Sequence, residues 1–118
     1  MALFQQLKQF FSQPDLDEVM AFQYKIPHSI TVAVTKEDEY FIAKIEKIDN
    51  RKLKNDTVMT KAKTMPELVI EVNDLLLTYL DFPENVKPRM PQLLPPEFAA
   101  QTLKKLKNAA HKELVFAK

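Results

Sequence analysis

The sequence predicts a single α+β domain: a three-stranded antiparallel sheet with one long core helix packed on one face, plus short N-terminal and C-terminal helices. Three observations predict this class. Residues typical of β-strands alternate with polar ones over 30–35 and recur in 40–45 and 57–62. A capping sequence and four turns of helical apolar periodicity occupy 64–80. The length of 118 residues, with 46% hydrophobic and 28% charged residues, fits one ordinary globular domain.

The prolines divide this single domain, residues 1–118, into four parts. Residues 1–28 are interpreted as a helical extension and 29–82 as a β-β-β-α core. Residues 83–96 are a proline-rich connector, and 97–116 are interpreted as a C-terminal helix.

The N-terminal extension carries two patterns. Its first part predicts a short helix, because apolar residues recur at helical spacing: Leu3, Phe4, Leu7, Phe10 and Phe11. In the second part, Asp15 followed three residues later by Glu18 has the form of a capping box and favours a helix. The alternating residues of 20–26 favour a strand instead, so both alternatives stay open.

The first two strands must be joined by a hairpin that lacks glycine. The usual Asn-Gly or Asp-Gly turn is absent, and Lys36-Glu37-Asp38-Glu39 takes its place. Asp38 is the residue there best suited to positive φ, and Asn50 or Asn55 serves the next turn.

The long helix has the strongest local signal in the sequence. Thr64 and Glu67 form a capping box, and Pro66 lies in the first turn, where no amide is needed. Pro83 is expected to end the helix. Ile70 and Leu77 lie outside the main apolar stripe and are interpreted as a surface for a partner or a second subunit, so we expect a homodimer. The stripe itself comprises Met65, Leu68, Val69, Val72, Leu75, Leu76, Tyr79 and Leu80.

The C-terminal segment is expected to be one amphipathic helix rich in lysine. Its apolar residues have near-helical spacing from Phe98 to Leu114. An anionic partner would contact the four lysines around that stripe, which gives an alternative function as a nucleic-acid-binding or assembly protein with weak, salt-sensitive phosphate contacts. These candidate anion-contacting residues are Lys104, Lys105, Lys107 and Lys112.

The composition excludes several classes of site. The chain has no glycine, so phosphate-binding glycine loops and the nucleophile elbow are excluded. It also has no cysteine, which excludes disulfides and thiolate chemistry and fits a cytoplasmic location. His28 and His111 are 83 positions apart, outside any metal-binding motif. We therefore expect no catalytic, metal or cofactor site. A small hydrolase remains an alternative, with its carboxylates drawn from Glu37, Glu39, Glu46, Glu67, Glu71 and Asp74.

The segment from Ile30 to Pro95 resembles the HicB-like antitoxin domain family. The first hairpin, Ile30 to Ala43, matches that family's strand-turn-strand, and Thr64-Met65-Pro66-Glu67-Leu68 matches its Thr-capped helix. Phe82-Pro83-Glu84 begins a similar proline-containing exit. The resemblance implies a β-β-β-α core like a truncated ribonuclease H fold without its catalytic acids. It also implies a non-catalytic, protein-binding module that neutralises a small toxin protein.

Overall fold

The computed structural model describes residues 15–53 and 57–118. The helix expected within residues 1–14 lies outside this part of the chain. The described elements, in chain order, are α2 (Leu16–Lys25), β1 (Ser29–Glu37), β2 (Tyr40–Ile48), β3 (Arg51–Lys52), β4 (Met59–Ala62), α3 (Met65–Tyr79), the 3-10 helix η1 (Lys87–Arg89), α4 (Ala99–Lys104) and β5 (His111–Ala117).

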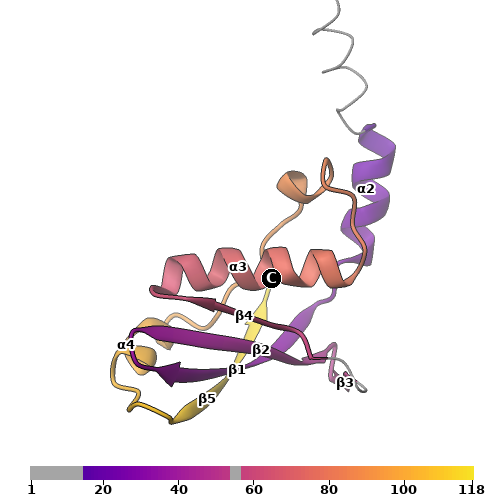
Figure 1. Ribbon diagram of the computed structural model, residues 1–118. Helices are drawn as coiled ribbons and strands as arrows, with labels where there is room; N and C mark the ends of the chain where they lie inside the picture. Colours follow the sequence, from indigo (N-terminus) through magenta and orange to yellow (C-terminus); the bar gives the residue numbers. More distant parts are fainter. Residues whose placement is uncertain (1–14, 54–56) are drawn as a thin grey trace, which may run out of the picture.

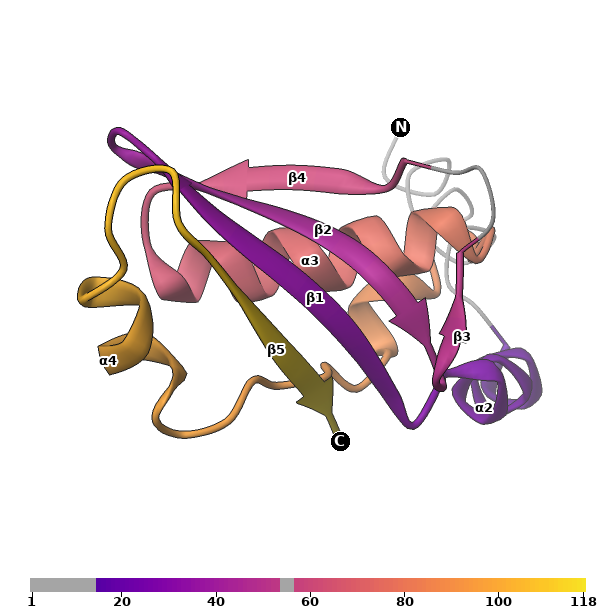
Figure 2. The same cartoon turned by 90° about the horizontal axis from the view of Figure 1, so that it is seen from below.

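The sheet is antiparallel, and its five described strands exceed the three that the sequence predicts. β1 pairs with β2 along one side and with β5 along the other. The far side of β2 pairs with β4 near its start and with the short β3 at its end. Helix α3 lies across one face of this sheet, and no other described element covers the opposite face, which looks toward the viewer in Figure 2. The α+β class with one main helix on a sheet is therefore confirmed.

The turns take positive φ at aspartate and asparagine, as the absence of glycine requires. Asp38, in the β1–β2 hairpin, has a φ of 53°, and Asn50, before β3, has a φ of 66°. Both were expected, whereas Asn55 lies outside the described residues. Short polar side chains tolerate this region better than other non-glycine residues do.

Helix α3 begins as the capping sequence predicts but ends before the proline. The Oγ1 atom of Thr64 accepts a hydrogen bond from the Glu67 amide at 3.3 Å. At the other end, Asp81 adopts a φ of 66° and its amide donates to the Thr78 carbonyl, while the Phe82 amide donates to the Leu77 carbonyl. These two bonds form a Schellman motif, so the helix ends there, upstream of Pro83.

The core lies between α3 and the covered face of the sheet. Alternate residues of β1 point into it and are almost fully buried. At about 1.5–3 kcal/mol for each large apolar side chain removed from water, this layer dominates the stabilising terms. Its central members are Ile30, Val32, Val34, Ile45, Leu68, Val72, Leu76, Leu114 and Phe116.

The expectation of one C-terminal helix over 97–116 is wrong. The chain forms the short α4, turns at Ala109 with a φ of 67°, and returns as β5 along β1. Leu114 and Phe116 point into the core while Glu113 and Val115 are exposed, which is strand periodicity. β5 satisfies the second edge of β1, whose backbone groups a terminal helix would leave unpaired.

Residues 16–25 form the helix α2, which resolves the ambiguity between helix and strand. Val19 and Ile26 are buried, and the ring of Phe22 packs on that of Phe82 at a centroid distance of 4.9 Å. The Asp15 side chain accepts no capping hydrogen bond, so the predicted capping box does not form. Packing against Phe82 is what fixes this helix on the body of the protein.

Candidate functional site

The outer edge of β5 presents backbone hydrogen-bonding groups without a partner among the described residues. The amide of Lys36 donates to the Ala110 carbonyl, so even-numbered residues of β5 bond to β1. Ala117 exchanges both of its backbone bonds with Leu94 on the opposite side, at 2.8 Å each. Because bonding direction alternates along an antiparallel strand, Glu113 and Val115 point their amides and carbonyls outward as Ala117 does.

This edge is short and is flanked by apolar side chains. The Leu94–Ala117 bridge closes its carboxyl end, so the free part runs from His111 to Val115. Val115 is 51% exposed and Leu94 is 54% exposed. Figure 2 shows β5 as the outermost strand of the sheet on this side. An edge of this kind can accept an extended segment of another protein as an additional strand.

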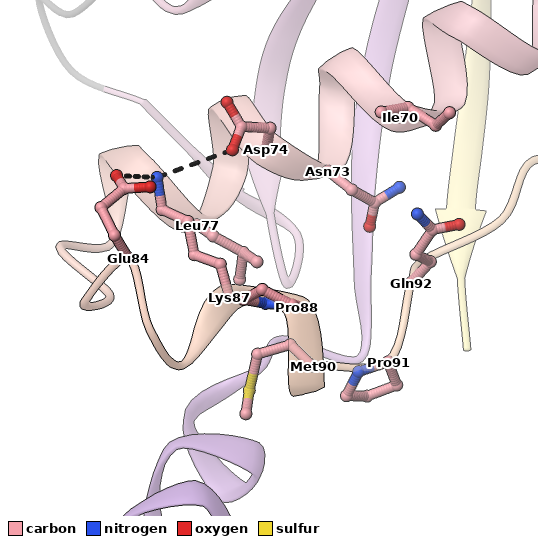
Figure 3. A pocket seen from close by; sticks show the side chains of 10 residues that line it. All are labelled: Ile70, Asn73, Asp74, Leu77, Glu84, Lys87, Pro88, Met90, Pro91 and Gln92. Carbon is pink, nitrogen blue, oxygen red and sulfur yellow. Dashed lines mark hydrogen bonds and ion pairs between the residues drawn. The ribbon is translucent and has the colours of Figure 1, made fainter. Parts of the chain in front are cut away.

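A second feature is the hollow between α3 and the connector, shown in Figure 3, with a volume of about 290 Å³. Asn73 on α3 is buried and pairs with the backbone of Leu93. Its Nδ2 donates to the Leu93 carbonyl at 2.9 Å, and its Oδ1 accepts from the Leu93 amide at 2.8 Å. The same Nδ2 donates to the Val69 carbonyl at 2.8 Å. The side-chain amide of Asn73 therefore exchanges two hydrogen bonds with the Leu93 backbone, as a neighbouring strand would, and holds the connector against α3.

Lys87 occupies the other end of this hollow. Its Nζ donates to Oε1 of Glu84 at 2.6 Å and to Oγ1 of Thr78 at 2.8 Å, and it lies 3.6 Å from Oδ1 of Asp74 (Figure 3). The hydrogen bond to Glu84, aided by the charge of Asp74, raises the pKa of Lys87, and burial of the side chain opposes this effect. The polar groups of Asn73 and Lys87 are thus already paired within the chain. The hollow is the place where the connector is attached to α3.

Only one of the two residues proposed as a partner surface on the long helix lies at the surface. Ile70 is 56% exposed, but Leu77 is 7% exposed, so its assignment to a surface is wrong. The Schellman turn brings Phe82 back, and the connector then covers this flank of α3, where Leu77 lines the hollow in Figure 3.

The four lysines proposed as anion contacts are exposed, but no single helix presents them. Lys104 ends α4, Lys105 and Lys107 follow it, and Lys112 lies on β5. The loop that contains them is fastened to the β1–β2 hairpin, because the Asp38 amide donates to Oδ1 of Asn108 at 2.8 Å. The acidic tip of that hairpin, residues 37–39, therefore lies beside the lysine loop and reduces its positive potential.

The carboxylates and histidines are dispersed over several elements. Glu46 lies on β2, whereas Glu71 and Asp74 lie on α3. Within 15–53 and 57–118, no three His, Asp or Glu side chains gather closely enough to hold a metal ion. In the same part of the chain, no helix is long and apolar enough to cross a membrane.

Comparison with known proteins gives no relative. No family model, no curated protein and no solved structure matches the chain.

The sequence alone did not indicate the outer edge of β5 or the attachment of the connector to α3 through Asn73. The alternation of Leu114 and Phe116 with Glu113 and Val115 was the available signal for β5. The role of Asn73 had no local signal, because its partner Leu93 lies twenty residues away.

Proposed function

We propose that the protein is a non-catalytic protein-binding module of HicB type, which binds a small partner protein by adding an extended segment of that partner to β5. The observation that carries the proposal is the exposed outer edge of β5, where Glu113 and Val115 direct their amides and carbonyls to solvent. Main-chain hydrogen bonds supply affinity in this mode of recognition, and neighbouring side chains supply specificity.

Two further observations support the proposal. Apart from the two-residue strand β3 between β2 and β4, the order β1, β2, β4, α3 agrees with the β-β-β-α core that the resemblance to HicB-like domains implies. In addition, Val115 and Leu94 give the edge an apolar border, which increases the surface that a bound strand would remove from water. Natural proteins normally cover or block edges of this kind.

A proline substitution at Glu113 tests the proposal. The Glu113 amide points away from β1, so Glu113→Pro removes an outward donor without breaking a hydrogen bond of the existing sheet. The matched control is Glu113→Ala, which removes the charge but keeps the amide. The binding partner to use is the product of the adjoining open reading frame, which for an antitoxin is a very small basic protein.

Isothermal titration with that partner gives the result. We expect wild type and Glu113→Ala to bind with affinities within about threefold of each other, and Glu113→Pro to lose at least tenfold. Equal binding by all three proteins would exclude the β5 edge. An adjoining frame that encodes no small basic protein would count against the antitoxin function itself.

A further inference from the structure

The uncovered face of the sheet looks toward the viewer in Figure 2, and lysines gather on one half of it. Val32 points into the core, so its neighbours Thr31 and Ala33 in β1 point to the uncovered face. Residues that lie opposite each other on neighbouring antiparallel strands share a face. Lys47 lies opposite Thr31 and Lys44 lies opposite Ala33, so both lysines belong to this face.

Two more lysines continue the group on the strands that flank β2. Lys61 in β4 lies opposite Ile42, two residues before Lys44, and Lys52 in β3 lies opposite Lys47. The Nζ atom of Lys61 lies 4.9 Å from the centroid of the Tyr40 ring, which keeps its charge beside the sheet. Directly opposite residues are about 5 Å apart and diagonal neighbours about 7–8 Å apart, so the lysines form one continuous row. This row, the basic track, consists of Lys61, Lys44, Lys47 and Lys52.

The charge of the basic track is not neutralised by the rest of the described structure. Among residues 15–53 and 57–118, none of its four lysines makes an ion pair. Lys47 and Lys52 lie directly opposite each other, where like charges destabilise a sheet. Glu46 lies in the bulge of β2, and Glu113 is separated from Lys44 by the whole width of β1, about 10 Å. A bound anion would relieve this repulsion.

The other side of the molecule has the opposite charge. Helix α3 contains no basic residue, and Glu67, Glu71 and Asp74 are exposed on it. The sheet lies between these acids and the basic track. A polyanion is therefore repelled from the helix side and attracted to the uncovered face of the sheet, which orients the protein as the two approach.

From the basic track and this separation of charge we infer that the uncovered face binds single-stranded nucleic acid through its phosphate backbone. A single row of cations matches one backbone, whereas a duplex presents two backbones across each groove. The track contains no Arg, Asn or Gln, the side chains that best hydrogen-bond base edges, so binding is independent of sequence.

Two observations favour nucleic acid over other anionic partners. The centres of protein interfaces are depleted in lysine and enriched in aromatic residues and arginine, which is the reverse of this track. Met59, which lies opposite Lys44, is 46% exposed and offers an apolar contact to the flat face of a base. An acidic peptide and a lipid headgroup have no base to place there.

A pair of double variants tests the inference. Lys44→Gln/Lys61→Gln removes two charges from the basic track, and Lys104→Gln/Lys105→Gln, the matched control, removes two exposed charges around the end of α4. Both variants lower the net charge equally. Circular dichroism checks that each is folded, and fluorescence anisotropy measures binding to a labelled 12-nucleotide RNA of mixed sequence.

The salt dependence counts the contacts. Four contacts to a single strand give a slope of about 2.8 in log Kd against log salt, so wild type should lose about 50-fold in affinity between 50 and 200 mM NaCl. The control should match wild type within about twofold. Lys44→Gln/Lys61→Gln should bind at least tenfold more weakly at 50 mM, and its slope of about 1.4 predicts a loss of only about sevenfold over the same range.

Competition identifies the kind of anion. Polyglutamate and vesicles containing phosphatidylserine should each need at least tenfold more charge than unlabelled RNA to displace the labelled strand. Displacement by either one at an equal amount of charge, equal weakening by the two double variants, or no binding of RNA at 50 mM would overturn the inference. Strand addition uses backbone groups of β5, so Glu113→Pro should still bind RNA, and failure of either proposal leaves the other standing.

Discussion

Replacing Asn73 by alanine should destabilise the protein strongly, because this residue is the only side chain in the described structure that hydrogen-bonds the Leu93 backbone. The substitution removes the bonds at 2.9 and 2.8 Å and leaves the Leu93 amide and carbonyl buried without partners. Each stranded buried group costs about 1–3 kcal/mol, so the two together cost about 3 kcal/mol once some relaxation toward water is allowed. Typical domains have a total stability of only about 5–15 kcal/mol.

For 118 residues, an unfolding entropy of about 2.1 cal/mol/K per residue converts 1 kcal/mol into about 4 °C. Asn73→Ala should therefore lower Tm by about 12 °C in differential scanning calorimetry. Glu71→Ala is the control, because Glu71 is an exposed neighbour on the same helix, and its Tm should stay within about 2 °C of wild type.

Hydrogen exchange locates the effect. The Leu93 amide should lose its protection in Asn73→Ala at temperatures where the amides of Val32 and Leu76 stay protected. If Tm falls by less than 4 °C and Leu93 stays protected, then Asn73 does not fasten the connector and our account of the hollow is wrong.

Two further predictions concern single residues near the end of α3. Lys87→Met should reduce the free energy of unfolding by about 1 kcal/mol at neutral pH. The loss is this small because Glu84 and Asp74 are largely exposed, and solvent screens their attraction to Lys87. Because the pKa of Lys87 is raised in the folded protein, the stability that Lys87 contributes is complete below about pH 10.5 and is lost as the pH rises through the folded-state pKa. The urea-unfolding curves of wild type and Lys87→Met should therefore converge in alkali. A difference in stability that stays constant up to the highest pH would contradict the assignment of these contacts to Lys87. Asp81→Gly should raise stability by about 0.5–1 kcal/mol and Asp81→Ala should lower it, because φ at this position is 66°. A loss of stability in the glycine variant would contradict the Schellman assignment.

Local signals were sufficient for the parts of the fold that depend on local chemistry. Thr64 and Glu67 located the start of α3, because a capping box acts over four residues. Without glycine, the hairpin had to turn at a short polar residue, and Asp38 was correctly selected. The strands around Ile30 and Tyr40 also followed from alternation alone.

Long-range packing decided what the sequence did not. The near-helical spacing from Phe98 to Leu114 concealed a strand, because its pairing with β1 outweighs a weak local preference. Leu77 was assigned to the surface because nothing local shows that the connector covers it. The candidate edge depends on β5, so it could not be proposed before the terminal strand was known.

Amide exchange at β5, measured by NMR with and without whatever protein the adjoining reading frame encodes, tests the central proposal most directly. The amides of Leu114 and Phe116 face β1 and should be protected in both samples, whereas those of Glu113 and Val115 should exchange freely in the unbound protein. We predict that binding slows exchange at Glu113 and Val115 by at least tenfold. A complex that forms while these two amides exchange at their unbound rates would contradict strand addition at β5.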